Sequence, residues 1–498
     1  MSDGMGSENG PAITSESATW RRTLRLSLAD AALSTTLQTL TAGVFITGFG
    51  LALGASQVQI GLLAALPTLG NVAQIVGSYF IERTGQRKTL CLVTTAIARS
   101  VWFAILLTPF LWRASAAALV WAIVLMLASS SALAAIGGVA WLSWMKDLVP
   151  NGRRADFLSR RNQIGTGLAL SLSIVAGLFL DWWEIHHSEP LTGFAVVFAV
   201  AALCGLAAVP FLRATPDVPL PTRASHEPFT KLITLPVRDR NFRSLVFFYA
   251  YWNLSVNLAG PFFNVYMLRE LDLPFWYATL VNTLAGVASL VTNRFWVRLS
   301  SQFGYKPVVF LATLGNAFFP LTWLFVSREW AWVLLITHLT GVFNSVLVLG
   351  PTNIMFKLAP DRNASAYLAV FNAVVGPATA LAPVLGGVLA GAMSGMSWSL
   401  GPLVIEGIKF IFLFSFVLRL SSLLLLHRVA EPEAEAVRHV VRVLRNVKIP
   451  NLIEDAHATL ALRRESRRRR VPAPHFTHGS TGSVSNQPTE HSKSRISK

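Results

Sequence analysis

The chain has 498 residues, of which 53% are hydrophobic and only 13% are charged. A soluble globular protein carries about 25% charged residues, so this chain has too few charges to cover a water-facing surface of its size. Lys and Arg number 42 against 25 Asp and Glu, a formal net charge of +17. The composition excludes an ordinary soluble enzyme, and the positive surplus indicates either nucleic acid or a membrane surface as a partner.

Residues 1–19 are polar and lack the apolar core and cleavage site of a signal peptide. We therefore expect the first apolar segment to remain in the chain as a membrane span. Both cysteines, Cys91 and Cys204, lie in apolar runs. We expect them to be small buried side chains rather than a disulfide framework.

Twelve apolar runs are long enough to cross a bilayer, because a hydrocarbon core of about 30 Å needs about 20 residues of helix. The chain is therefore predicted to be an all-α integral membrane protein. In chain order the runs are 29–53, 60–81, 89–111, 115–142, 163–182, 191–212, 244–268, 276–296, 308–327, 331–356, 366–393 and 406–426.

The positive charges are distributed unevenly over this map. If the N-terminus lies inside and the spans alternate, 36 of the 42 Lys and Arg residues fall in inner segments. The outer loops hold three, Arg113, Arg269 and Arg328, and the spans hold the remaining three. This positive-inside pattern predicts that both termini are cytoplasmic, and it explains most of the basic surplus without nucleic acid.

The predicted domain organisation has five parts. The proline-rich stretch 213–243 separates six spans from six, as a linker between two bundles would. In the tail, residues 431–448 have apolar side chains at helical spacing, which predicts an amphipathic surface helix. The parts are a cytoplasmic segment 1–28, a bundle 29–212, a cytoplasmic linker 213–243, a second bundle 244–426 and a basic, partly disordered cytoplasmic tail 427–498.

The two bundles share weak internal repeats. Residues 145–150 after the fourth span match residues 355–360 after the tenth in Met, Leu and Pro positions, at a constant offset of 210. A looser match at an offset of 219 relates 84–87 to 303–306. Six spans separate the copies, so they have the same orientation. Two parallel six-helix repeats around a midplane site are a known transporter plan.

The loop between the second and third spans reads ERTGQRK over residues 82–88, after Gly77. It resembles the glycine–acid–basic–x–glycine–basic–basic pattern of the major facilitator superfamily (MFS), with the leading glycine displaced by one position. The resemblance implies an MFS-like fold over 29–426: twelve transmembrane helices in two parallel-repeat six-helix bundles. It also implies a gate made by Glu82, Arg83, Gly85 and Arg87.

A gate at this loop has a physical basis. Gly85 can take the positive φ of a tight turn, and the Glu82 carboxylate can bind a helix N-terminus of the other bundle. Making and breaking that contact would bias two access states. The alternative is a charged turn that only obeys the positive-inside rule.

The chain departs from the family pattern in two places. The fourth span has Ser129, Ser130 and Ser131 where proton-coupled members often carry an arginine, and the fifth span has no glycine–proline motif of drug antiporters. The eleventh span instead contains 376–377, Gly-Pro, and 382–387, Ala-Pro-Val-Leu-Gly-Gly. Drug/proton antiport is therefore not expected, and ion coupling stays open.

Ionisable residues within spans are costly and are candidates for function. Arg99 lies about 15 Å into the third span, where it either binds an anionic substrate group or forms a structural pair, for example with Asp30. Arg419 lies near the inner end of the last span, and we expect its side chain to reach the interface. We expect Lys409 to form a local ion pair with Glu406, three residues before it.

The seventh span carries a polar stripe at three- and four-residue spacing that includes Pro261. Such a stripe faces the bundle interior or water rather than lipid, and in the resembled family the matching helix lines the central cavity. The alternative is hydrogen bonding between helices, worth about 0.6 kcal/mol on average. The predicted substrate-binding residues are Gln38, Arg99, Asn253, Asn257, Asn264, His338 and Asn344.

No cofactor, metal or catalytic residue is predicted. The adjacent His186 and His187 of an outer loop cannot easily share one tetrahedral ion, so we expect a solvated loop. The phosphate-binding pattern G-x-x-x-x-G-K-[ST] is absent from the sequence, so ATP-driven pumping by this chain alone is not expected. The arginine-rich tail is expected to contact anionic lipid or to anchor the topology.

These features predict a secondary active transporter of a small solute, and not an enzyme. We expect a multi-pass monomer in the cell (inner or plasma) membrane. Two alternatives stay open: a carrier-shaped receptor or sensor that signals through the basic tail, and an integral-membrane enzyme that modifies lipids. Removal of residues 430–498 should silence a sensor but leave a carrier active.

Overall fold

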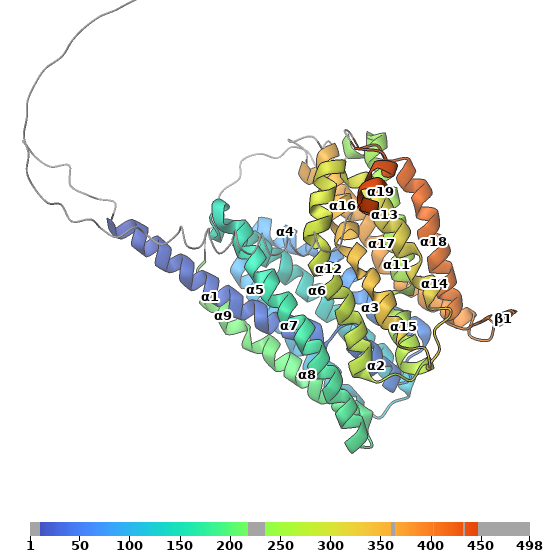
Figure 1. The fold of residues 1–498 in the computed structure, drawn as a ribbon. Helices are drawn as coiled ribbons and strands as arrows, with labels where there is room; N and C mark the ends of the chain where they lie inside the picture. Colours follow the sequence, from blue (N-terminus) through green and yellow to red (C-terminus); the bar gives the residue numbers. More distant parts are fainter. Residues whose placement is uncertain (1–9, 218–234, 360–363, 402, 432–433, 447–498) are drawn as a thin grey trace, which may run out of the picture. The chain divides into compact units, whose positions relative to one another are not determined.

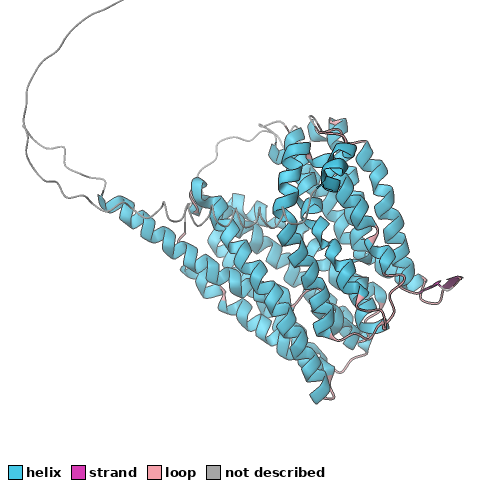
Figure 2. Ribbon diagram, in the orientation of Figure 1, coloured by secondary structure: helices cyan, strands magenta, loops and turns pink. Residues whose placement is uncertain are grey.

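The structure is a computed structural model that describes residues 10–217, 235–359, 364–401, 403–431 and 434–446. The described residues are helical apart from one short hairpin (Figures 1 and 2). The chain divides into two compact units, Met1–Val440 and Val441–Lys498, and all the spans belong to the first. Most of the predicted linker and the arginine run of the tail lie outside the described residues.

The first six spans follow the predicted apolar runs. They are α1 (Gly10–Leu40) with α2 (Val44–Ala52); α3 (Gln57–Leu69) with η1 (Gly70–Ala73) and α4 (Gln74–Thr84); α5 (Arg87–Leu111); α6 (Ala116–Leu148); α7 (Asn151–His186); and α8 (Pro190–Ala207) with α9 (Val209–Ala214). We call these helices the N-half.

The last six spans, which we call the C-half, also follow the predicted runs. They are α11 (Arg240–Val265) with η2 (Tyr266–Glu270); α12 (Phe275–Phe303); α13 (Tyr305–Ala317) with α14 (Phe319–Thr322); α15 (Val333–Thr337) with η3 (His338–Phe343) and α16 (Asn344–Leu358); α17 (Ala364–Ala392); and α18 (Lys409–His427). Strands β1 (Ser397–Leu400) and β2 (Leu403–Glu406) pair antiparallel between α17 and α18, and α19 (Val437–Asn446) follows the last span.

Nine helices of the described residues are long and apolar enough to cross a bilayer. The other three spans are interrupted or polar. Gly43, with a φ of 57°, separates α1 from α2, and α13 ends at Ala317, just before Pro320. Helix α11 is continuous but carries the predicted asparagine stripe, which lowers its mean hydropathy.

The outward surface of these helices is apolar. Leu125 of α6, Val291 of α12 and Leu424 of α18 are 70%, 74% and 73% exposed. Soluble proteins rarely expose large contiguous apolar areas. Lipid, rather than water, is therefore the solvent that suits this surface.

Each half packs around its own aromatic core. In the N-half, Phe49, Trp102 and Phe198 meet with ring centroids 5.0–5.4 Å apart. In the C-half, Phe263 stacks on Phe412 at 4.7 Å. Between the halves, α3 packs on α17 and α7 packs on α12. We call the end of the bundle that carries the turns at Gly85 and Gly304 the inner end, and the opposite end the outer end.

Arg419 does not reach the interface as predicted. Its side chain is 2% exposed and lies inside the C-half, where its guanidinium donates to the backbone and side-chain oxygens of Asn316 at 3.2 and 2.9 Å. Pro320 has no N–H to offer the Asn316 carbonyl four residues earlier. Arg419 supplies a donor at this helix break, which explains why it stays buried.

The predicted ion pair between Lys409 and Glu406 is wrong. The prediction assumed one helix face, but Glu406 ends strand β2 and Lys409 begins α18. The Lys409 ammonium donates to the Val404 carbonyl oxygen at 3.3 Å. Cys91 and Cys204 are both free, as predicted, but only Cys91 is buried and Cys204 is half-buried.

Candidate substrate cavity and gates

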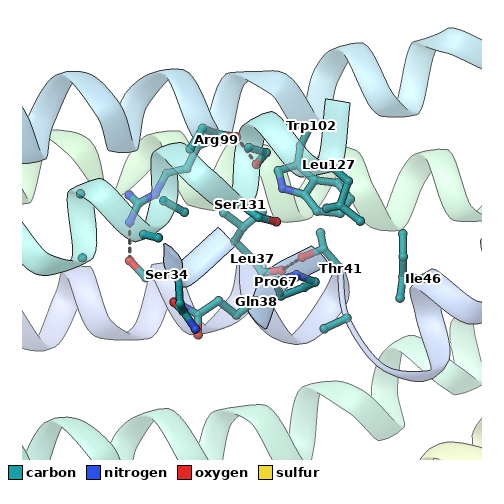
Figure 3. A pocket seen from close by; sticks show the side chains of 18 of the residues that line it. Ser34, Leu37, Gln38, Thr41, Ile46, Pro67, Arg99, Trp102, Leu127 and Ser131 are labelled. Atoms are coloured by element: carbon teal, nitrogen blue, oxygen red, sulfur yellow. Dashed lines mark hydrogen bonds between the residues drawn. The ribbon is translucent and has the colours of Figure 1, made fainter. Parts of the chain in front are cut away.

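A cavity of about 900 Å³ lies between the two halves. Helices α1, α3, α5 and α6 of the N-half and α11 of the C-half contribute most of its wall, and Figure 3 shows side chains from the N-half helices meeting there. Its polar lining consists of Asp30, Ser34, Gln38, Thr41, Thr47, Asn71, Gln74, Thr95, Arg99, Ser130, Ser131, Arg161, Asn257 and Asn264.

The charged part of the cavity is a cluster around Asp30, which is 2% exposed. Its carboxylate accepts from Arg161 at 2.7 Å and from the Ser34 hydroxyl at 3.1 Å, and it lies 3.7 Å from Arg99. Arg161 also stacks on the Trp141 ring at 4.4 Å. Two guanidinium groups share one carboxylate, so this wall of the cavity keeps one net positive charge.

Arg99 bonds mainly to the N-half itself. It donates to the Ser34 hydroxyl at 2.7 Å, drawn as a dashed line in Figure 3, and to the Gly205 carbonyl at 2.6 Å. Gly205 lies one turn before the break between α8 and α9. The structural pairing with Asp30 weighed from the sequence is therefore present, although Arg99 also lines the cavity.

The asparagine stripe of α11 reaches the cavity in part. Asn257 and Asn264 line it, together with Pro261, but Asn253 is not among the lining residues. The amides of Asn253 and Asn257 donate to the carbonyls one turn earlier, at 2.8 Å each. The side-chain oxygens of Asn253 and Asn257 therefore remain available as acceptors. The side-chain oxygen of Asn264 accepts from the Asn282 amide of α12 at 3.1 Å.

His338 and Asn344 are not brought to this cavity. The His338 ring is 5% exposed, lies against Phe319 and Trp323, and is joined to the Leu334 carbonyl at 2.8 Å. Asn344 accepts a long bond of 3.4 Å from Asn316. His338 begins η3 and Asn344 begins α16, so both lie where the tenth span departs from a regular α-helix.

The turn at the inner end of α4 has the predicted geometry. Gly85 takes a φ of 68° and caps α4. Arg83 donates to the Tyr79 hydroxyl at 3.0 Å, and the buried Arg87 pairs with Asp147 of α6 and donates to the Ser143 carbonyl at 2.8 Å. These contacts all lie within the N-half.

Glu82 makes no contact of the predicted kind. It is exposed, and among the described residues no hydrogen bond or ion pair joins it to the C-half. The gating role of Glu82, Arg83, Gly85 and Arg87 stays a prediction.

An acid does bind a helix N-terminus of the other half, but at the outer end. The Asp181 carboxylate of α7 accepts from the backbone N–H groups of Phe275 and Trp276, the first residues of α12, at 2.6 and 2.7 Å. A carboxylate at this position satisfies free N–H groups and opposes the positive end of the helix dipole. We call this contact the outer latch.

The Phe275 ring closes the outer end above the cavity. A Cβ at Gly48 of α2 would lie 2.5 Å from this ring, and a Cβ at Gly177 of α7 would lie 2.9 Å from the Trp276 Cα. The ring also meets Phe194 of α8 edge-on at 5.5 Å. Glycines on two N-half helices thus let the start of α12 approach closely.

Helices α3 and α17 complete the closure. A Cβ at Gly61 would lie 2.3 Å from the Pro383 carbonyl oxygen, and one at Gly387 would lie 2.5 Å from the Gln57 carbonyl oxygen. Only glycine allows this backbone approach. By contrast, the cavity lining includes Cys91 and Leu212, which lie within about one turn of the inner ends of α5 and α9. The cavity is therefore closed at the outer end and extends toward the inner end.

The segment after the last span binds the inner end of the C-half. The Glu431 side chain is fully buried. Its carboxylate accepts from the backbone N–H of Lys306 and from the Lys357 ammonium, at 2.6 Å each. Asn241 exchanges two hydrogen bonds with Ala430, and Glu435 donates its N–H to the Phe303 carbonyl. We call the described residues of this segment, 428–431 and 434–440, the inner strap.

The strap supplies a charge that the repeat lacks in the C-half. By the repeat offsets, Lys306 corresponds to Arg87 and Lys357 corresponds to Asp147, so a base replaces the acid of the N-half pair. Glu431 supplies the missing negative charge. Of the helix predicted over 431–448, the described part is α19 (Val437–Asn446), which begins within the strap.

Several residues of the cavity and its closure are not marked in the sequence. Arg161 is one of many basic residues in the inner segments, and Asp181 lies near an outer helix end with nothing local to mark it. Pro383 and Gly387 belong to the Pro- and Gly-containing stretch of the eleventh span, which by itself assigns them no role. Spacing of small residues on one helix face is the sequence signal that could have indicated a close helix contact.

The described residues contain no group of three or more His, Cys, Asp or Glu side chains that could hold a metal ion. The His186 and His187 rings pack on the tryptophans one turn earlier, with His187 stacked on Trp183 at 4.0 Å.

Comparison with known proteins identifies the fold. The sequence profile of the Major Facilitator Superfamily matches residues 29–291 and 245–476. Among solved structures, a variant of the nucleoside transporter NupG aligns with a TM-score of 0.63 at 11% identity, covering 81% of this chain and 99% of that one. No curated protein sequence matches.

Two further solved structures have the same arrangement. A D-xylose-proton symporter aligns with a TM-score of 0.62 at 14% identity, covering 83% of this chain and 99% of that chain. A bacterial homologue of the iron transporter ferroportin, in an inward-facing state, aligns at 0.60 and 16% identity, covering 82% and 98%. The predicted all-α membrane fold of twelve spans in two parallel six-helix repeats is confirmed, and the chain belongs to the major facilitator superfamily of transporters.

Proposed function

We propose that the protein is a secondary active transporter that binds a small solute in the central cavity and moves it by alternating access. The asymmetry of that cavity is the observation that supports the proposal most strongly. Both halves line it, the outer latch and the α3–α17 contact close one end, and its lining extends toward the other. Rocking of the two halves would expose the same residues to the opposite side.

Gln38, Arg99, Asn257 and Asn264 are the proposed substrate-binding residues that line the cavity. Asn253, His338 and Asn344 would act only through packing. We assign the inner gate to the turn at Gly85: in the outward-facing state Glu82 would accept from a helix N-terminus of the C-half, as Asp181 does at the outer end now.

We further propose that the chain is a monomer in the inner or plasma membrane with both termini and the linker 213–243 in the cytoplasm, and bundles at 29–212 and 244–426. The concentration of Lys and Arg in the inner segments supports this orientation. Single cysteines at Arg113 and Arg238, in a background without Cys91 and Cys204, test it with an impermeant thiol reagent. Labelling of both from the same side of the membrane would contradict the proposed topology.

Uptake into proteoliposomes is the direct test of transport. The solute panel includes nucleosides, pentoses and divalent metal ions, which the structurally similar transporters suggest, and each solute is tested with and without a pH gradient. At least one solute should enter faster than into empty liposomes. A dependence on the pH gradient would indicate proton coupling, and no uptake over the whole panel would count against a carrier.

Asn257→Ala and Asn353→Ala form a matched pair for the binding site. Both amides donate to the carbonyl one turn earlier, at 2.8 and 2.9 Å, but only Asn257 lines the cavity. We expect the first substitution to raise the KM for the transported solute about tenfold and the second to leave it unchanged. Equal effects would remove Asn257 from the proposed site.

A further inference from the structure

A second, smaller cavity of about 350 Å³ lies on the C-half, away from the substrate cavity. Helices α11, α17 and α18 form its walls. The lining is apolar along most of its depth, with Phe247 62% exposed at its edge. The lining residues are Ser244, Phe247, Ala250, Tyr251, Leu254, Ala378, Leu425 and Arg428. We call this cavity the C-half groove.

The groove has the depth of one leaflet. From Ser244 to Leu254 the α11 wall rises about 15 Å at 1.5 Å per residue, and half of a hydrocarbon core is also about 15 Å. A cavity of about 350 Å³ along that depth is a narrow, elongated groove rather than a broad cleft. The hydroxyls of Tyr251 and Ser421 join α11 to α18 at 2.9 Å, beside the deep part of the groove.

Positive charge gathers at the inner end of the groove. Arg428 lines it and is exposed. Arg240 is also exposed and stands one turn before Ser244 on the same face of α11, since residues 240, 244, 247, 251 and 254 follow helical spacing. Among the described residues no ion pair joins either arginine to an acid, and the nearby Glu431 is buried against Lys357.

We propose that the C-half groove binds one acyl chain of an anionic phospholipid of the inner leaflet, with the lipid phosphate between Arg428 and Arg240. The apolar wall suits the chain and excludes water. The two guanidinium groups suit a phosphodiester that carries net negative charge, because a zwitterionic headgroup brings its own cation to the same place. Basic pockets between helices at the inner side of a membrane bind such headgroups.

Native mass spectrometry of the purified full-length protein tests the site. The probes are phosphatidylglycerol and phosphatidylcholine with identical chains, titrated against the wild type and single variants. We expect a one-to-one adduct that prefers phosphatidylglycerol. Arg428→Gln and Arg240→Gln should each weaken that adduct about fivefold, the effect of about one basic residue near a charged lipid surface. Arg294→Gln is the matched control, because Arg294 is exposed on α12, which does not line the groove.

A second pair of variants tests the chain-binding wall independently of charge. Ala378→Phe fills the groove from α17, whereas Ala373→Phe adds the same ring at an exposed position of that helix outside the lining. The first should abolish the adduct of either lipid and the second should retain it. Equal retention of the two lipids by the wild type, or equal losses in Arg428→Gln and Arg294→Gln, would overturn the proposal.

Discussion

In each half, a buried arginine donates a hydrogen bond to a backbone carbonyl beside a helix break. Arg99 of α5 donates to the Gly205 carbonyl next to the α8–α9 break, and Arg419 of α18 donates to the Asn316 carbonyl next to the α13–α14 break. In lipid a carbonyl without a donor costs several kcal/mol. A guanidinium with several donors can serve a broken helix and its neighbours at once.

Arg419→Met should destabilise the protein by about 2–3 kcal/mol, because it leaves the Asn316 carbonyl and amide oxygen without their donor in a buried place. Thermal unfolding in detergent measures the change. In the Pro320→Ala background the loss should be smaller, since residue 320 then has an N–H for the Asn316 carbonyl. Equal losses in both backgrounds would show that Arg419 does not act through the break.

At the scale of helices, the outer latch is the contact that joins the halves most specifically. Asp181 caps α12 from the end of α7, and the Phe275 ring lies against glycines of two other helices. In the proposed alternating-access cycle these contacts would form in one access state and break in the other. Helix capping is worth about 0.5–2 kcal/mol, which is enough to bias two states without locking either.

Asp181→Ala should shift the protein toward the state with the outer end open. Loss of 1–2 kcal/mol changes the ratio of two states by about 5- to 30-fold. Spin labels at Ser188 and Glu270, in a background without Cys91 and Cys204, report the outer separation as a distance distribution. Glu184→Ala is the control, because Glu184 is an exposed acid one turn further along α7. An unchanged distribution in Asp181→Ala would exclude the latch.

The inner strap changes how the tail can be tested. Cutting at residue 430 removes Glu431, whose buried carboxylate holds Lys357 and the start of α13. We expect that cut to cost about 3 kcal/mol, as the loss of a buried charged partner does, and so to impair a carrier as well as a sensor. A cut after Asn446 should leave stability and transport unchanged. Thermal melts of both truncations, compared with Glu431→Gln, separate the strap from the tail.

At the scale of the whole molecule, closure of one end depends on backbone contact between α3 and α17. Gly387→Val should prevent that contact, because a Cβ there meets the Gln57 carbonyl oxygen at 2.5 Å. The labelled pair at 188 and 270 should lose its short-distance population, and transport should fall more than tenfold. Gly391→Val, one turn further on α17 with no atom within 4 Å of its Cβ position, should behave as wild type. Inhibition by both would point to α17 itself rather than to closure.

The sequence predicts the spans and their order, because a helix surrounded by lipid needs a long apolar run. It also predicts the repeat, because similar turn sequences follow the second and eighth spans, at Gly85 and Gly304. Four of the seven predicted binding residues line the cavity: Gln38, Arg99, Asn257 and Asn264. Helical spacing predicts one polar stripe on α11, of which Asn257 and Asn264 line the cavity and Asn253 does not. His338 is predicted only as a polar residue of the tenth span, without such spacing, and it lies outside the cavity lining.

The sequence by itself determined that this chain crosses a membrane about a dozen times as two like-oriented sets, since hydropathy and charge act locally along the chain. Only the tertiary structure decided which end of the cavity is closed, that Asp181 rather than Glu82 binds a partner helix, and that Arg161 joins Asp30. Those contacts connect residues far apart in the chain, between helices whose rotation and separation no local pattern encodes.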